Sequence, residues 1–119
     1  MSNGFISLQQ AIDMTTRYRQ NKNAVIDPAY SSNDILSICN TFNKADIEAL
    51  VAKPECAAIR LYFGMNEDLQ VRPMLVAVDS NDNDILPPDA SDAGEIGEFI
   101  ADNTVICPPF CPNPSVLNS

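Results

Sequence analysis

Residues 56–86, CAAIRLYFGMNEDLQVRPMLVAVDSNDNDIL, decide the fold that this sequence predicts. The first half of the stretch alternates, and successive side chains of an extended strand point to opposite faces. One face carries four apolar side chains, those of Ile59, Leu61, Phe63 and Met65. The polar residues 66–68 then favour a turn. This pattern predicts an antiparallel hairpin with one face of its sheet against a helix.

The second run of this stretch, residues 71–78, is apolar on both faces. Pro73 has no N–H to donate, which indicates a bulge or a sheet edge near the start of the strand. An apolar second face must be covered, either by the C-terminal tail or by another subunit. We therefore expect an interaction surface on this strand, joined by one aromatic residue of the tail. Its side chains are those of Val71, Met74, Val76, Val78 and Phe110.

Two helices and another strand are predicted around the hairpin. A capping box at Ser7 begins a helix over residues 8–20, whose apolar side chains recur at helical spacing. Asn43 is a candidate N-cap for a shorter helix over residues 44–52. The apolar spacing of residues 35–42 fits either a helix or a strand, and their short length and β-branched side chains favour a strand.

The predicted fold class is α+β, with a small antiparallel sheet of three to four strands, two helices on one face and an extended C-terminal tail. A chain of 119 residues suits one domain. We place the globular domain at residues 1–86. Residues 87–119 are acidic and contain proline and cysteine, and we expect them to pack on the domain or to be partly mobile.

Charge is distributed unevenly along the chain, whose net charge is −9. Residues 79–119 contain eight acidic residues and no basic one, and the rest is nearly neutral. Without a basic patch, the sequence predicts no binding to nucleic acid or to an anionic membrane. No run approaches the ~20 apolar residues of a membrane span, and the N-terminus lacks the pattern of a secretory signal. We expect a cytoplasmic protein with reduced cysteines.

The residue types that most enzymes rely on are largely missing. The chain has no histidine, which excludes Ser-His-Asp and Cys-His catalysis and histidine-ligated metal sites. Its four glycines are scattered and form no phosphate-binding loop. Acidic residues are plentiful, but none falls in a recognisable acid–base constellation. The sequence therefore predicts neither an enzyme nor a cofactor.

Two motifs could bind metal or carry redox chemistry. Asp79, Asn81 and Asn83 offer oxygen ligands at the spacing that opens a calcium loop, but position six is not glycine and position twelve is not glutamate. A polar turn is the favoured interpretation, with weak cation binding as the alternative. Cys107 and Cys111 are separated by three residues, one more than in the usual redox motif. Structural, unreactive thiols are favoured, and a disulfide or redox pair and a metal site stay open.

Three of these segments resemble a group of small uncharacterised bacterial proteins. That group has a strand of the Ile-Arg-aromatic-aromatic-Gly type, an Asp/Asn-rich turn ending in Asp-Ile-Leu, and a closing Cys-Pro-Pro-aromatic-Cys. The corresponding segments here are residues 59–64, 79–86 and 107–111. The resemblance covers about half of the chain. It implies a recurring role for the cysteine pair and carries over no functional residue.

The leading functional hypothesis is a small non-enzymatic interaction or assembly module. It would bind a protein partner, or a second copy of itself, through the apolar sheet face or edge and the CPPFC tail. The alternative is a thiol-redox or metal-binding protein that uses Cys107 and Cys111.

Overall fold

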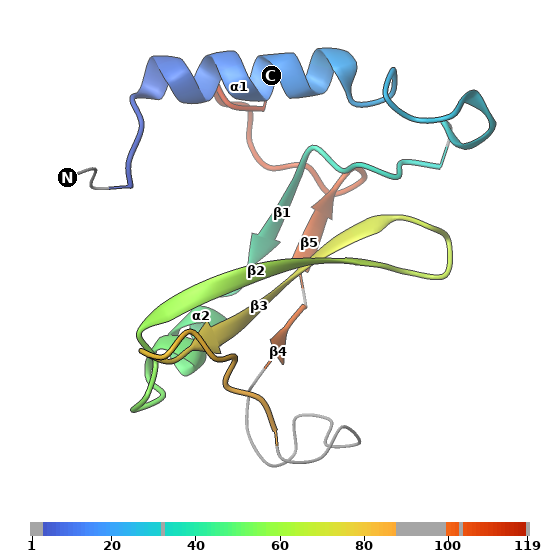
Figure 1. Ribbon diagram of the computed structural model, residues 1–119. Helices are drawn as coiled ribbons and strands as arrows, with labels where there is room; N and C mark the ends of the chain where they lie inside the picture. The colour runs from blue at the N-terminus through green and yellow to red at the C-terminus, as the bar shows by residue number, and fades with distance from the viewer. Residues whose placement is uncertain (1–3, 32, 88–99, 103, 119) are drawn as a thin grey trace. The chain divides into compact units, whose positions relative to one another are not determined.

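The computed structural model describes residues 4–31, 33–87, 100–102 and 104–118. Its elements follow the chain in the order α1 (Leu8–Asn21), a 3₁₀ turn (Pro28–Tyr30), β1 (Cys39–Phe42), α2 (Lys44–Val51), β2 (Ala58–Met65), β3 (Val71–Val78), β4 (Ile100–Ala101) and β5 (Thr104–Cys107). Strands β2, β3 and β4 form one antiparallel sheet, and β1 pairs with β5 (Figure 1). The predicted α+β class is confirmed.

The chain forms two compact units. One contains Met1–Cys39 with Ile106–Ser119, and the other contains Asn40–Val105. The predicted boundary between a domain 1–86 and a tail 87–119 stays a prediction.

In the first unit, α1 begins with the predicted capping box. The Ser7 hydroxyl accepts from the backbone N–H of Gln10, whose side chain accepts from the Ser7 N–H at 2.8 Å. The Tyr18 hydroxyl donates to the carbonyl of Ser37, and Arg19 Nη1 donates to the carbonyl of Leu117 at 2.6 Å. These two bonds connect the helix to segments before β1 and near the C-terminus.

The predicted strand over residues 35–42 is only partly correct. Strand β1 covers Cys39–Phe42, and residues 33–38 are irregular. Asp34 adopts a positive φ of 50°, a conformation outside the β region. The apolar side chains of this segment predicted the strand type but gave no signal for its start.

In the second unit, the core lies between α2 and the open end of the β2–β3 hairpin (Figure 1). Leu50 of α2 packs with Leu75 and Ala77 of β3, and partly buried apolar side chains surround them. These are the side chains of Phe42, Cys56, Ile85 and Ala101. Asn43 is the N-cap of α2 as predicted, but its side chain makes no capping hydrogen bond.

The two turns that flank β3 have the same construction. In the first, Asn66 Oδ1 accepts from the N–H groups two and four residues later, at 3.0 and 2.9 Å. In the second, Asp79 Oδ1 accepts at 2.9 and 3.0 Å from the N–H groups at the same two offsets. Each turn has a left-handed residue in its fourth position, Leu69 with φ 62° and Asp82 with φ 68°. A short polar side chain thus organises each reversal of the chain.

Candidate functional site

The candidate site is the outer edge of β2. Among the strands that the described residues form, β2 pairs only with β3, from Ala58↔Val78 to Met65↔Val71. Residues of an antiparallel pair alternate between those that bond to the partner strand and those whose N–H and C=O point away from it. Two hydrogen bonds show which residues of β2 point away.

The first of these bonds closes the hairpin, where the Asn66 N–H donates to the Gln70 carbonyl at 3.1 Å. Even-numbered residues of β2 therefore bond to β3, and odd-numbered ones face outward. The second bond agrees, because the Ala77 carbonyl accepts from the Ile85 N–H on the far side of β3, at 2.9 Å. Ala77 is the partner of Ile59, whose own N–H and C=O consequently face outward.

The same alternation explains how Pro73 fits within β3. Its partner is Phe63, an outward-facing position, so this pair needs no N–H from the proline. On the other side, the described residues of β4 pair with β3 at Leu75 and Val76. Of the two predicted alternatives, a bulge is not seen at this position, because Pro73 pairs with Phe63 within a continuous register.

The four residues of β2 whose backbone groups face outward also carry large apolar side chains. We call them the β2 row: Ile59, Leu61, Phe63 and Met65. They share a sheet face with Leu75 and Ala77, which pack on α2, and burial was expected for them. Instead their side chains are 38%, 45%, 79% and 58% exposed. Helix α2 covers the open end of the hairpin, and exposure is greatest toward the loop end (Figure 1).

The opposite face of the sheet is covered by a polar network. Arg60 Nη1 lies 2.6 Å from Asp84 Oδ1, Arg60 Nη2 bonds to Asp82, and the Tyr62 hydroxyl donates to Asp84 Oδ2. Asp84 pairs with Val78 beyond β3, so the side chains from β2 reach across β3 to meet it. Val76 and Val78 lie on this face and are only 2% and 3% exposed. The network therefore contributes cover for the apolar face that the sequence left unexplained.

The electrostatics of this network favour structure over catalysis. The hydrogen bond from Tyr62 and then the one from Arg60 lower the pKa of Asp84. The hydrogen bond that Tyr62 donates to Asp84 raises the pKa of Tyr62. The hydrogen bond that Arg60 donates to Asp84 raises the pKa of Arg60. A carboxylate with a lowered pKa is a weak proton acceptor, and a tyrosine with a raised pKa is a weak proton donor near neutral pH. These groups hold one another in place and do not form an acid–base pair.

In the calcium-like turn, the first candidate ligand, Asp79, forms hydrogen bonds within the turn. Asp79 Oδ1 accepts two backbone N–H groups of its own turn, and Asn81 and Asn83 supply them. In the described part of the chain, no group of three or more cysteine, aspartate or glutamate side chains could hold a metal ion.

Two of the four cysteines form a disulfide, which corrects the expectation that all are reduced. Cys107 and Cys111 are bonded, with their Cα atoms 4.4 Å apart. Cys107 is buried, whereas Cys111 and the neighbouring Phe110 are exposed. Cys39 and Cys56 are free thiols. The short cysteine spacing thus brings the pair together, and the burial of its two members differs.

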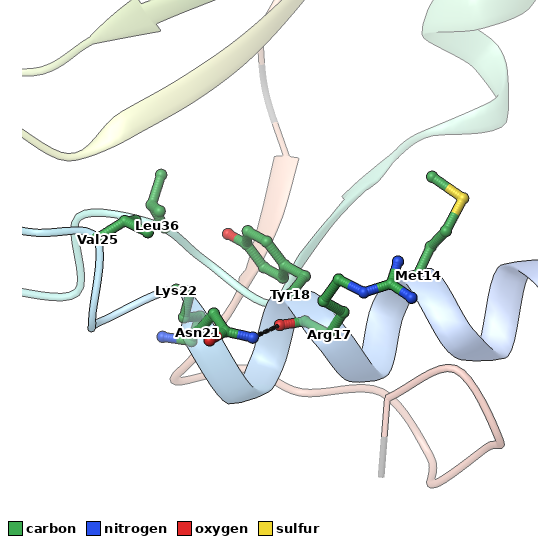
Figure 2. Close-up of a pocket in the computed structure, with 7 residues that line it drawn as sticks. All are labelled: Met14, Arg17, Tyr18, Asn21, Lys22, Val25 and Leu36. Atoms are coloured by element: carbon green, nitrogen blue, oxygen red, sulfur yellow. Dashed lines mark hydrogen bonds between the residues drawn. The ribbon is translucent and has the colours of Figure 1, made fainter.

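The first unit contains a shallow apolar groove along α1, with a volume of about 350 Å³ (Figure 2). One stripe of the helix forms its wall, and Leu36 lies across from Tyr18. Burial raises the pKa of Tyr18. The other lining residues are Met14, Arg17, Asn21, Lys22 and Val25. The sequence predicted this helix but gave no signal for the groove.

The residues of the predicted interaction surface differ in burial, and the surface itself stays a prediction. Val76 and Val78 are buried within the chain, Val71 and Met74 are half-buried, and Phe110 is exposed in the other unit. The exposed apolar row lies on the neighbouring strand. The alternation of residues 59–65 already indicated the β2 row, but we interpreted that row as a buried face.

Neither α1 nor α2, the helices of the described residues, is long and apolar enough to cross a membrane. Comparisons with known protein families, with curated proteins and with solved structures find no match.

Proposed function

We propose that this protein is a non-enzymatic interaction module whose binding surface is the β2 row. The observation that carries this proposal is the coincidence of exposed apolar side chains and outward-facing backbone groups on the same four residues. Such an edge can bind an added strand, since the backbone provides hydrogen bonds and the side chains provide apolar contact.

The composition of β2 supports the proposal. Soluble proteins commonly protect a sheet edge with charge, proline, a bulge or a very short strand. Strand β2 has eight residues, no proline and a regular register with β3. Its single charged side chain, that of Arg60, bonds to Asp82 and Asp84 across β3. Strand β2 itself therefore has no proline, no bulge and no short length to protect its edge, and its one charged side chain is engaged across β3.

Replacing Phe63 with lysine tests the proposal. Phe63 is the most exposed member of the β2 row, and aromatic side chains often dominate interfaces. We expect Phe63→Lys to weaken association about tenfold or more, because a charge then stands in the contact surface. Light scattering over a concentration series and quantitative capture from lysate measure association with self and with other proteins.

The matched control is Phe110→Lys, which introduces the same charge at a similarly exposed phenylalanine of the CPPFC segment. We expect it to leave association unchanged. If Phe110→Lys weakens binding and Phe63→Lys does not, the surface is the tail and not β2. A wild-type protein that stays monomeric and captures nothing would contradict the interaction function.

A second candidate function, thiol–disulfide exchange, is favoured by the unequal exposure of the cysteine pair. Cys111 is accessible, so an external thiolate can attack its Sγ. The bond to Cys107 then breaks, Cys107 leaves as the thiolate, and a mixed disulfide remains on Cys111. The external thiol is the reductant in this exchange.

Mass spectrometry after incubation with reduced glutathione tests this candidate. We expect the untreated protein to have two free thiols, on Cys39 and Cys56, and the treated protein to carry a glutathione adduct on Cys111. A Cys111→Ser variant should lose that adduct. Four free thiols in freshly purified protein, or a disulfide unchanged by glutathione, would rule out this candidate.

A further inference from the structure

We infer that the partner of the β2 row is a second copy of this chain, paired antiparallel through β2 around a two-fold axis at Tyr62. The inference rests on the proposed function and names its partner. The outward N–H and C=O groups need hydrogen-bond partners along the edge, and another strand provides them at the right spacing. The chain itself contains a strand with this property, namely β2.

Alternation restricts the possible registers. Outward-facing residues must meet outward-facing residues, so the sum of two paired residue numbers must be even. The axis at Tyr62 pairs Ile59 with Met65 of the second copy, and Leu61 with Phe63. All four members of the β2 row in each copy then have bonded partners. Moving the axis from Tyr62 to Leu61 shifts the register by two residues. Met65 then has no partner from the β2 row.

The side chains agree with this register on both faces. On the face of the β2 row, every cross-strand pair is apolar, and aromatic–aliphatic pairs stabilise sheets. On the other face, Arg60 meets Gly64 of the second copy, which has no side chain beyond hydrogen. An axis at Arg60 would instead place two arginines directly opposite each other, and like charges in that position are destabilising.

The contact is small, which sets the strength that we expect. One shared strand edge and four apolar side chains per copy bury on the order of 1,000 Å² in total, at the low end of specific interfaces. The dimer should therefore be weak and visible only as concentration rises. It would join two three-stranded sheets into one of six strands.

Cysteine cross-linking tests both the partner and the register. In a background with Cys39→Ser and Cys56→Ser, Tyr62→Cys should form a disulfide between copies, because residues of a non-bonded pair have Cα atoms about 4.5 Å apart. Arg60→Cys is the matched control, since its two copies would lie about 13 Å apart along the strands. We expect Phe63→Lys, added to Tyr62→Cys, to remove most of the cross-link.

A second measurement avoids the loss of the Tyr62 hydroxyl. A mixture of Leu61→Cys protein with Phe63→Cys protein should cross-link more than either alone, because these positions pair in the inferred register. Equal cross-linking by Arg60→Cys, or none from the mixture, would overturn the register. A wild-type monomer that still captures another protein through Phe63 would overturn the second copy as partner and leave the proposed function standing.

Discussion

Replacing Leu50 with alanine is expected to lower the free energy of unfolding of the second unit, which contains β2 and β3, by about 3 kcal/mol. Leu50 is 1% exposed and is the only residue of α2 that is fully buried. It joins the helix to Leu75 and Ala77 of β3, and alanine would leave a cavity at that contact. Urea denaturation, followed by far-UV circular dichroism, measures the change because the chain has no tryptophan.

The matched control is Val51→Ala, on the next residue of the same helix. Val51 is largely exposed, and alanine has a higher helix propensity than valine, so the free energy of unfolding should change by less than about 0.5 kcal/mol. If Leu50→Ala and Val51→Ala lowered the free energy of unfolding by similar amounts, the placement of the core between α2 and β3 would be contradicted.

Replacing Asp84 with asparagine is expected to lower the melting temperature by roughly 5 °C at neutral pH. The carboxylate of Asp84 bonds to both the Arg60 guanidinium and the Tyr62 hydroxyl and joins them over Val76 and Val78. The variant removes this carboxylate. The effect depends on pH. Because the folded pKa of Asp84 lies below its ordinary value of 3.8, its ionised form contributes stability above that value. This contribution is lost as the pH falls through the lowered pKa.

The difference in melting temperature between wild type and Asp84→Asn should accordingly be constant above about pH 5 and shrink in the acid range below 3.8. Asp82→Asn is the control, because Asp82 also bonds to Arg60 but its side chain is 85% exposed. An exposed ion pair contributes little, so this variant should melt within about 2 °C of wild type. If Asp82→Asn lowered the melting temperature more than Asp84→Asn, Asp84 would not be the main carboxylate of the network.

Local patterns were enough to predict most of the elements. The capping box at Ser7 placed the start of α1, alternation placed the first arm of the hairpin, and an apolar run after the polar turn placed the second. The strand predicted over residues 35–42 was too long because its apolar side chains fit a helix and a strand alike, and Asp34, just before it, has a positive φ. The cysteine pair left a disulfide among several open outcomes, since spacing alone does not settle geometry.

The alternation of residues was enough to assign the side chains of the hairpin to its two faces, because the period of a strand is fixed by its backbone. Which face is covered, and by which residues, could be known only from the folded chain. Coverage depends on contacts between distant residues: Leu50 reaches only the open end of the hairpin, and Asp84 draws Arg60 and Tyr62 over the valines of β3. The β2 row was therefore legible as a face from the start, and its exposure became known only with the fold.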